Sequence, residues 1–102
     1  MEFEFKDKNL LDLYTKGKSR NYRLENNVIK NFVKRVASIE NANTIFDLRK
    51  PPSMRFEKLE GYQNRFSIRI NDQFRLEFDI DFKDENKTKG KVEILNISKH
   101  YK

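Results

Sequence analysis

The chain has 102 residues, no cysteine and one histidine, and its 22 basic and 16 acidic residues give a net charge of +6. This length fits a single domain over residues 1–102, and the lack of cysteine excludes disulfides, a thiol nucleophile and thiolate metal sites. One histidine cannot form a histidine cluster, so we expect neither a metal nor a cofactor. No apolar run approaches the ~20 residues of a membrane span, so we expect a cytoplasmic protein without a membrane partner.

The first half of the chain predicts one strand and two main helices. Residues 2–6 alternate polar and apolar, which is typical of a half-buried strand. Asp7 is a suitable N-cap for a short helix that ends at Gly17. A longer helix is predicted over residues 24–41, where apolar residues recur every four positions. One more helical turn is expected at residues 45–48, before a Pro-Pro pair stops it.

From residue 54 onward the period of the apolar residues changes to two. This alternation predicts strands over residues 54–59, 66–71, 74–82 and 92–97, separated by polar turns and a polar loop. The order β-α-α-β-β-β-β predicts an α+β fold, in which two N-terminal helices pack on one face of a mainly antiparallel sheet.

Positive charge is concentrated in residues 14–36, which hold seven basic residues and one acidic residue, whereas charges balance elsewhere. A concentrated basic surface suits a polyanion, because each neutralised phosphate releases counterions. A solvated helix face that only promotes solubility is the alternative. The candidate RNA- or ribosome-binding residues are Lys16, Lys18, Arg20, Arg23, Lys30, Lys34 and, from the later sheet, Lys58.

The face of the predicted sheet that points away from the helices is unusually polar, and it is the first place to look for a site. An ordinary solvated sheet with cross-strand Glu–Arg pairs is the alternative. The residues predicted on this open face are Glu57, Ser67, Arg69, Asn71, Arg75 and Glu77.

Two stretches, Phe56–Gly61 (FEKLEG) and Phe66–Phe78 (FSIRINDQFRLEF), resemble HigB-like toxins, a branch of the RelE/ParE superfamily of toxin–antitoxin systems. The family pattern reads L-E-x-L-x-G, then S-I-R-V-N-D-Q-W-R-L-x-F, so Phe56 and Phe74 are apolar replacements. Stretches near the N-terminus and before the proline pair also look like the family, and the resemblance covers nearly the whole chain.

The resemblance implies a RelE-like toxin that cuts mRNA on the ribosome without a metal and so inhibits translation. The basic surface would then dock on ribosomal RNA. A HigA-like helix-turn-helix antitoxin is the implied partner that neutralises the toxin, and the toxin–antitoxin complex is expected to bind operator DNA.

Metal-free RNA cleavage needs a group that takes the 2′ proton, cations that hold charge on the phosphate, and a donor for the 5′ oxygen. Arg75 occupies the functional arginine position of the family motif, and a guanidinium matches phosphate geometry. Arg69 lies on the same predicted face. Glu57 is a candidate acceptor of the 2′ proton, or it neutralises Arg75.

The C-terminus supplies two more catalytic candidates. Family members often end in an Asp-Tyr-His type triplet, whereas this chain reads Lys99-His100-Tyr101. The acidic position is therefore Lys99, and the other two residues are in swapped order. His100 has an unperturbed pKa near 6.5, which suits acid–base chemistry at neutral pH. Tyr101 is the accompanying candidate.

Two other functions fit the same scaffold. A ParE-like toxin that inhibits DNA gyrase needs no general acid or base. A catalytically degraded toxin would only bind its antitoxin, and the altered terminal triplet keeps this alternative open. The central S-I-R-I-N-D-Q-F-R motif favours the endonuclease.

Overall fold

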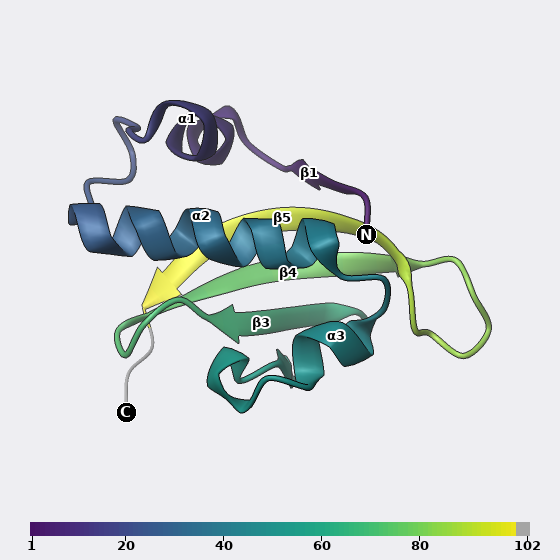
Figure 1. Cartoon of the computed structure of the whole chain (residues 1–102). Helices are drawn as coiled ribbons and strands as arrows, with labels where there is room; N and C mark the ends of the chain where they lie inside the picture. Colours follow the sequence, from purple (N-terminus) through teal and green to yellow (C-terminus); the bar gives the residue numbers. More distant parts are fainter. Residues whose placement is uncertain (100–102) are drawn as a thin grey trace.

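The computed structural model describes residues 1–99 and contains a five-stranded sheet whose one face is covered by helices (Figure 1). The prediction of an α+β fold is confirmed. In chain order the elements are β1 (Phe3–Phe5), α1 (Lys8–Lys16), α2 (Asn26–Asn41), α3 (Ile45–Arg49), the 3₁₀ helix η1 (Pro52–Met54), β2 (Glu57–Lys58), β3 (Arg65–Arg69), β4 (Phe74–Phe82) and β5 (Gly90–Lys99).

The sheet has the strand order β1-β5-β4-β3-β2. The last four strands pair antiparallel, as predicted, whereas β1 pairs parallel with β5 and makes the sheet mixed. A register shift between Glu77 and Phe78 marks a bulge in the pairing of β4 with β5. The N-terminal strand therefore lies beside the C-terminal strand, at one edge of the sheet.

Local sequence explains both ends of α1. The carboxylate of Asp7 accepts a hydrogen bond from the backbone N–H of Leu10 at 2.9 Å, which satisfies an N-terminal donor. Gly17 has φ 75° and donates to the Leu13 carbonyl at 3.1 Å, the left-handed cap that glycine adopts without strain. Both predicted ends are confirmed. Helix α2 begins at Asn26, two residues later than predicted.

The strand predicted over residues 54–59 is wrong for its first half. Pro52 opens a 3₁₀ turn that Met54 closes, and Arg55 follows in the left-handed region with φ 45° and ψ 53°. That conformation is incompatible with an extended strand, so β2 pairs with β3 only at Glu57 and Lys58. β5 is longer than predicted, because its pairing with β4 continues at both ends.

The core lies between the helices and one face of the sheet. Burying each large apolar side chain contributes roughly 1.5–3 kcal/mol relative to leaving it exposed. Fully buried residues on the two sides of this core include Leu10, Leu13, Phe32 and Val36 from the helices and Ile68, Leu76, Phe78 and Ile94 from the sheet. Within residues 1–99, no helix has the length and apolar character needed to cross a bilayer.

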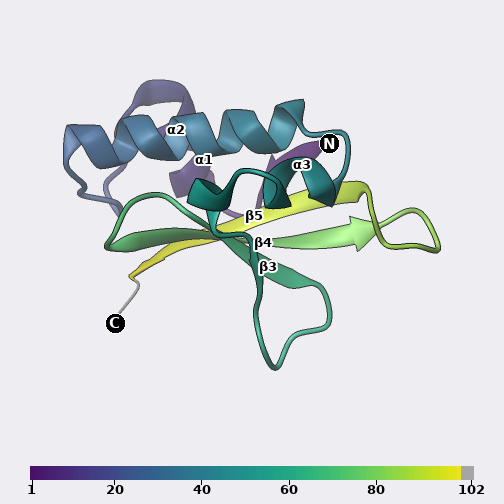
Figure 2. The same cartoon turned by 60° about the horizontal axis from the view of Figure 1, so that its bottom comes forward.

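Three segments meet at one end of the molecule. Figures 1 and 2 both place the N-terminal end of α2, the β3–β4 turn and the C-terminal end of β5 there. The segment between α1 and α2 lies at the same end, because Tyr22 is partly buried against the core and close to the backbone of Ile97 in β5. The predicted basic segment and the predicted sheet site thus lie near each other.

Candidate active site

The strand register places the predicted polar residues together on the sheet face opposite the helices. Ser67 pairs with both Glu57 and Glu77, and Arg69 pairs with Arg75. Since directly paired residues share a face, these five side chains belong to one surface, as predicted. Asn71, the sixth member of the prediction, lies in the β3–β4 turn, where its side chain accepts from the backbone N–H groups of residues 73 and 74.

The expectation that this whole face is wet is wrong at its centre. Ser67 is 1% exposed and Arg75 is 6% exposed. The Arg75 Nε donates to Ser67 Oγ at 2.9 Å, and its Nη2 donates to the carbonyl oxygen of Arg55. Glu57 Oε2 lies 3.8 Å from the same Nη2. The guanidinium is therefore held in one orientation, because three neighbours contact it.

Arg75, its cross-strand partner Arg69 and Arg55, whose carbonyl accepts a hydrogen bond from Arg75, form a cluster of three arginines. Burial lowers the pKa of the Arg75 guanidinium, the charge of Glu57 opposes this effect, and the charges of Arg55 and Arg69 lower the pKa further. An arginine nevertheless stays protonated near neutral pH. We call these three residues, Arg55, Arg69 and Arg75, the arginine cluster.

Arg55 was missed as a candidate from the sequence. Its side chain is exposed, and its positive φ is a costly conformation for a residue other than glycine. The hydrogen bond from Arg75 to its carbonyl holds the backbone there. Its place directly before the FEKLEG stretch could have marked it as a candidate. No local sequence pattern indicates that an arginine adopts a left-handed conformation. Strained backbone that surrounding contacts hold in place is typical of functional sites.

Arg69 connects the arginine cluster to the basic helix. Its Nη2 lies 2.5 Å from Asp72 Oδ1, so the side chain crosses the β3–β4 turn. Arg35 of α2 donates from Nε to the Arg69 carbonyl at 2.7 Å. Burial and the charge of Arg69 both lower the pKa of Arg35. Arg35 of α2 thus lies next to Arg69 at the end of β3.

Glu57 and Lys58 form the short edge strand β2. The side chain of Glu57 is 57% exposed, so it is open to a ligand while it also lies against Arg75. This position fits both of the roles considered for it, proton acceptor and neutralising partner. Lys58 is exposed and pairs with Phe66, which places it on the other side of the strand from Glu57.

The predicted basic surface is exposed. In the part of the chain that the structure describes, an ion pair is found for only one of its helix and loop residues, between Lys16 and Asp12 at 3.6 Å. The exposed residues of this surface are Lys16, Lys18, Arg20, Arg23, Lys30 and Lys34. Unpaired exposed cations at the same end as the arginine cluster are what a long polyanion requires.

His100 and Tyr101 lie outside the described residues, so their predicted roles stay predictions. The described part of β5 ends at Lys99, which pairs with Phe74 next to Arg75. Ser98, the preceding residue, pairs with Arg75 itself. β5 thus ends beside the arginine cluster.

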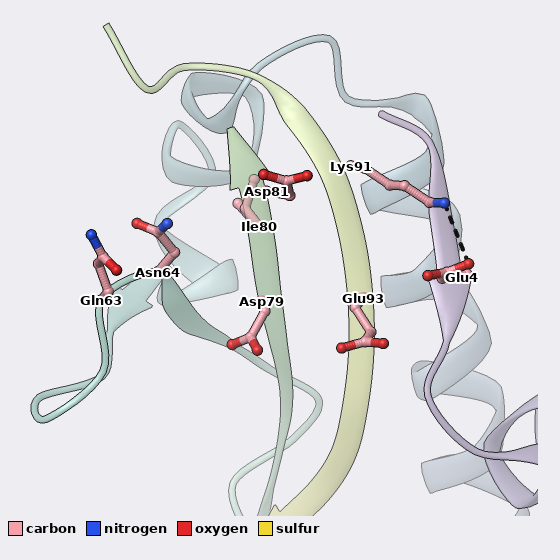
Figure 3. A pocket seen from close by; sticks show the side chains of 8 residues that line it. All are labelled: Glu4, Gln63, Asn64, Asp79, Ile80, Asp81, Lys91 and Glu93. Atoms are coloured by element: carbon pink, nitrogen blue, oxygen red, sulfur yellow. Dashed lines mark ion pairs between the residues drawn. The ribbon is translucent and has the colours of Figure 1, made fainter. Parts of the chain in front are cut away.

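A hollow of about 520 Å³ occupies the other end of the same face (Figure 3). Lys91 pairs with Glu4 at 3.4 Å there. None of the predicted site residues lines the hollow. Its lining residues are Glu4, Gln63, Asn64, Asp79, Ile80, Asp81, Lys91 and Glu93. Three of its four carboxylates are ion-paired, Asp79 with Arg65, Asp81 with Lys83 and Glu4 with Lys91. Since carboxylates already engage these cations, the hollow is less suited to an RNA phosphate than the arginine cluster is.

Nothing in the site points to a metal, and within residues 1–99 no group of three or more His, Asp or Glu side chains is arranged to hold one. The chemistry available is that of fixed guanidinium groups beside one exposed carboxylate. Such a site binds a phosphate and stabilises negative charge that develops on it.

The fold is that of RelE-like toxins. The YoeB dimer from Staphylococcus aureus matches with a TM-score of 0.57 and 18% sequence identity, covering 99% of this chain and 98% of that chain. A YoeB/ParE toxin from Agrobacterium tumefaciens also matches with a TM-score of 0.57, at 14% identity, covering 99% of this chain and 100% of that chain. At such low identity these likenesses establish the fold alone.

Sequence comparison establishes the family. The family model described as "RelE-like toxin of type II toxin-antitoxin system HigB" matches residues 3–100. Toxin HigB-1 of Vibrio cholerae serotype O1 (strain ATCC 39315 / El Tor Inaba N16961) is 41% identical over 80 residues, or 76% of this chain and 82% of that protein. The chain therefore belongs to the HigB-like toxins of type II toxin–antitoxin systems. Membership implies an antitoxin partner.

Proposed function

We propose that the chain is a ribosome-dependent mRNA endonuclease that inhibits translation and works without a metal. The observation that carries this proposal is the arginine cluster. Arg69 and the fixed Arg75 share one sheet face, and the backbone of the exposed Arg55 contacts Arg75. The exposed carboxylate of Glu57 and Arg35 of the basic helix lie beside them. Phosphate is the ligand that this combination fits best.

In the proposed reaction the ribose 2′ oxygen attacks the adjacent phosphorus and the bond to the 5′ oxygen breaks. The products are a 2′,3′-cyclic phosphate and a 5′-hydroxyl end. Glu57 accepts the 2′ proton, and His100 returns a proton to the leaving 5′ oxygen. Arg55 and Arg69 hold the charge that develops on the phosphate, while Arg75 adds charge and holds Arg55 in place.

The basic surface on α1, α2 and their connection docks the toxin on ribosomal RNA in this proposal. Its exposed lysines and arginines neutralise phosphates without reading sequence. A helix-turn-helix antitoxin of the HigA kind inhibits the toxin, and the complex of both binds operator DNA. The proposal places these events in the cytoplasm, where translating ribosomes occur.

Gyrase inhibition is the second candidate, because one structural neighbour is described as a YoeB/ParE toxin. That activity needs a binding surface but no acid, base or phosphate-holding cation. A degraded toxin that only binds its antitoxin is the third reading, in which Arg75 serves the fold alone.

A reconstituted translation reaction with purified protein tests the proposal. The 5′ ends of the mRNA are mapped with and without ribosomes, and the chemistry of each new end is determined. We expect 5′-hydroxyl ends only on translated message, in register with the A-site codon. Intact message and undisturbed translation would contradict the proposal, and a parallel supercoiling assay with gyrase would then identify the second candidate.

A further inference from the structure

An exposed aromatic ring stands on the loop between β2 and β3, outside the arginine cluster. The side chain is Tyr62, which is 51% exposed. The guanidinium carbon of Arg65 lies 4.0 Å from the centroid of its ring, close enough for a strong cation–π contact. Gly61 has φ 84° immediately before Tyr62, a conformation that lets the loop turn at this point.

Arg65 is itself fixed. Its Nε donates to Asp79 Oδ1 at 2.8 Å, and its Nη2 donates to Asp79 Oδ2 at 3.1 Å. This two-bond pairing raises the pKa of Arg65 and orients the guanidinium plane. The ring of Tyr62 therefore rests on a rigid support, which reduces the entropy that a ligand must remove when it stacks on the ring.

The ring lies on the functional side of the sheet. Arg65 points to the same face as Ser67 and Arg69, because alternate residues of β3 share a face. Two residues of a strand span about 7 Å, so Arg65 lies close to Ser67, which binds the guanidinium of Arg75. This spacing is short enough for two adjacent nucleotides of one RNA strand, one at the arginine cluster and the next at the Tyr62 ring.

The surroundings select a base rather than a phosphate. Gln63 and Asn64, directly after Tyr62, line the acidic hollow together with Asp81 and Glu93. The cations here are already engaged by carboxylates, Arg65 by Asp79 and Lys83 by Asp81, which leaves them less able to bind an RNA phosphate. A base is uncharged and stacks on an aromatic ring. The two amide side chains offer donors and acceptors to the edge of such a base.

From these observations we infer that the Tyr62–Arg65 pair is a stacking platform for one unpaired base of the RNA, adjacent to the nucleotide whose phosphate the arginine cluster holds. This inference rests on the proposed function, because it takes RNA as the ligand. It adds a subsite that the arginine cluster and the basic surface do not include.

A matched control exists elsewhere in the chain. Phe46 on α3 is 54% exposed, and Arg49 lies 5.7 Å from its ring centroid. It is thus an equally exposed aromatic residue beside an arginine, but it belongs to a helix and not to the polar sheet face. The comparison of Tyr62 with Phe46 therefore separates a stacking platform from ordinary aromatic exposure.

The test uses a short single-stranded RNA that carries 2-aminopurine, whose fluorescence is quenched on stacking. Its riboses are 2′-O-methylated, which blocks cleavage during the titration. We expect Tyr62→Leu to weaken binding roughly tenfold, as for the loss of one stacked base, and to abolish quenching. Tyr62→Phe and Phe46→Leu should bind and quench like the wild-type protein. Thermal melting checks that each variant is folded.

The possible outcomes separate the two proposals. Wild-type binding that Tyr62→Leu leaves unchanged overturns the platform but not the endonuclease. A Tyr62→Leu variant that loses only antitoxin binding also overturns the platform and makes the ring a protein contact. A wild-type protein that binds no RNA overturns the platform, and the mapping of 5′ ends then decides the endonuclease separately.

Discussion

The two ends of the uncovered sheet face differ in their charged side chains, although the same strands β3, β4 and β5 form both. At one end Arg69 and Arg75 lie opposite each other, and Arg55 joins them from the edge. At the other end Asp79 lies opposite Glu93, and Asp81 opposite Lys91. At the second end Asp79 and Asp81 already bind Arg65 and Lys83, so the first end is the better site for a phosphate. We therefore expect the phosphates of an RNA strand to be bound at the arginine end of the face and not at the other end.

Burial distinguishes the arginines of the two ends more sharply than charge does. The side chain of Arg75 is 8% exposed, whereas Arg65 near the acidic end is 25% exposed and its partner Asp79 is 35% exposed. A charge that is buried among fixed neighbours interacts more strongly than one in water. We therefore expect substitutions at the arginine end to have larger effects than those at the acidic end.

Arg55→Gly is expected to have a large effect, second only to substitution of Arg75. Removing one exposed cation that holds the phosphate should slow cleavage by about 100-fold. The same change should raise the free energy of unfolding by up to about 1 kcal/mol, because glycine adopts the left-handed conformation without strain. Single-turnover cleavage on ribosomes and thermal melting measure the two effects. A variant that cleaves normally would remove Arg55 from the site.

Ser67→Ala should have a smaller effect, because it acts through Arg75. The substitution removes the acceptor of the 2.9 Å hydrogen bond from Arg75 Nε. Loss of this bond should cost about 1–3 kcal/mol of stability, since a buried charged donor loses its partner. We expect about tenfold slower cleavage at unchanged ribosome affinity, which single-turnover rates at several ribosome concentrations resolve. An equal rise in KM instead would indicate a binding role.

Reversing charge on the basic helix should weaken docking by a few-fold. The double substitution Lys30→Glu and Lys34→Glu removes two exposed cations and should flatten the dependence of ribosome binding on salt. The double substitution Lys87→Glu and Lys89→Glu, at two exposed lysines of the β4–β5 loop, is the matched control and should change binding less. If both variants bind alike, the basic surface contributes solubility rather than docking.

The smallest effect is expected at Asp84 in the β4–β5 loop. Hydrogen bonds from the Thr88 side chain and from the backbone lower the pKa of Asp84 below its ordinary value of 3.8. Because the folded pKa is depressed, the stabilisation is present at neutral pH and is lost as pH falls through the folded pKa. Melting temperatures of wild type and Asp84→Asn should therefore converge below that pH. A constant difference at all pH values would contradict this assignment.

The spacing of apolar residues, every three to four positions in the helices and every two in the strands, was enough to predict the two helices, the antiparallel strands and the shared face of Glu57, Arg69 and Arg75. It did not predict the burial of Arg75, which depends on Arg55 offering its carbonyl from beyond the sheet edge. That arrangement follows from the 3₁₀ turn at Pro52, where the sequence period still suggested a strand.

The hollow near Glu4 could not be predicted from the sequence for a related reason. Its Glu4 comes from β1, which pairs with β5 across nearly the whole length of the chain. A parallel pair between the first and last strands has no local turn signal. The Tyr62–Arg65 contact joins residues three apart, but its rigidity depends on Asp79 in the next strand.

The most direct test of the central claim is the single-turnover rate of A-site cleavage by Arg75→Lys. Lysine keeps the positive charge but loses the planar donors that contact Ser67 and Arg55. Arg49→Lys, an exposed arginine on α3, is the matched control. We expect a loss of at least about 100-fold for Arg75→Lys and none for Arg49→Lys. A folded Arg75→Lys protein that cleaves translated mRNA at the wild-type rate would contradict the central claim.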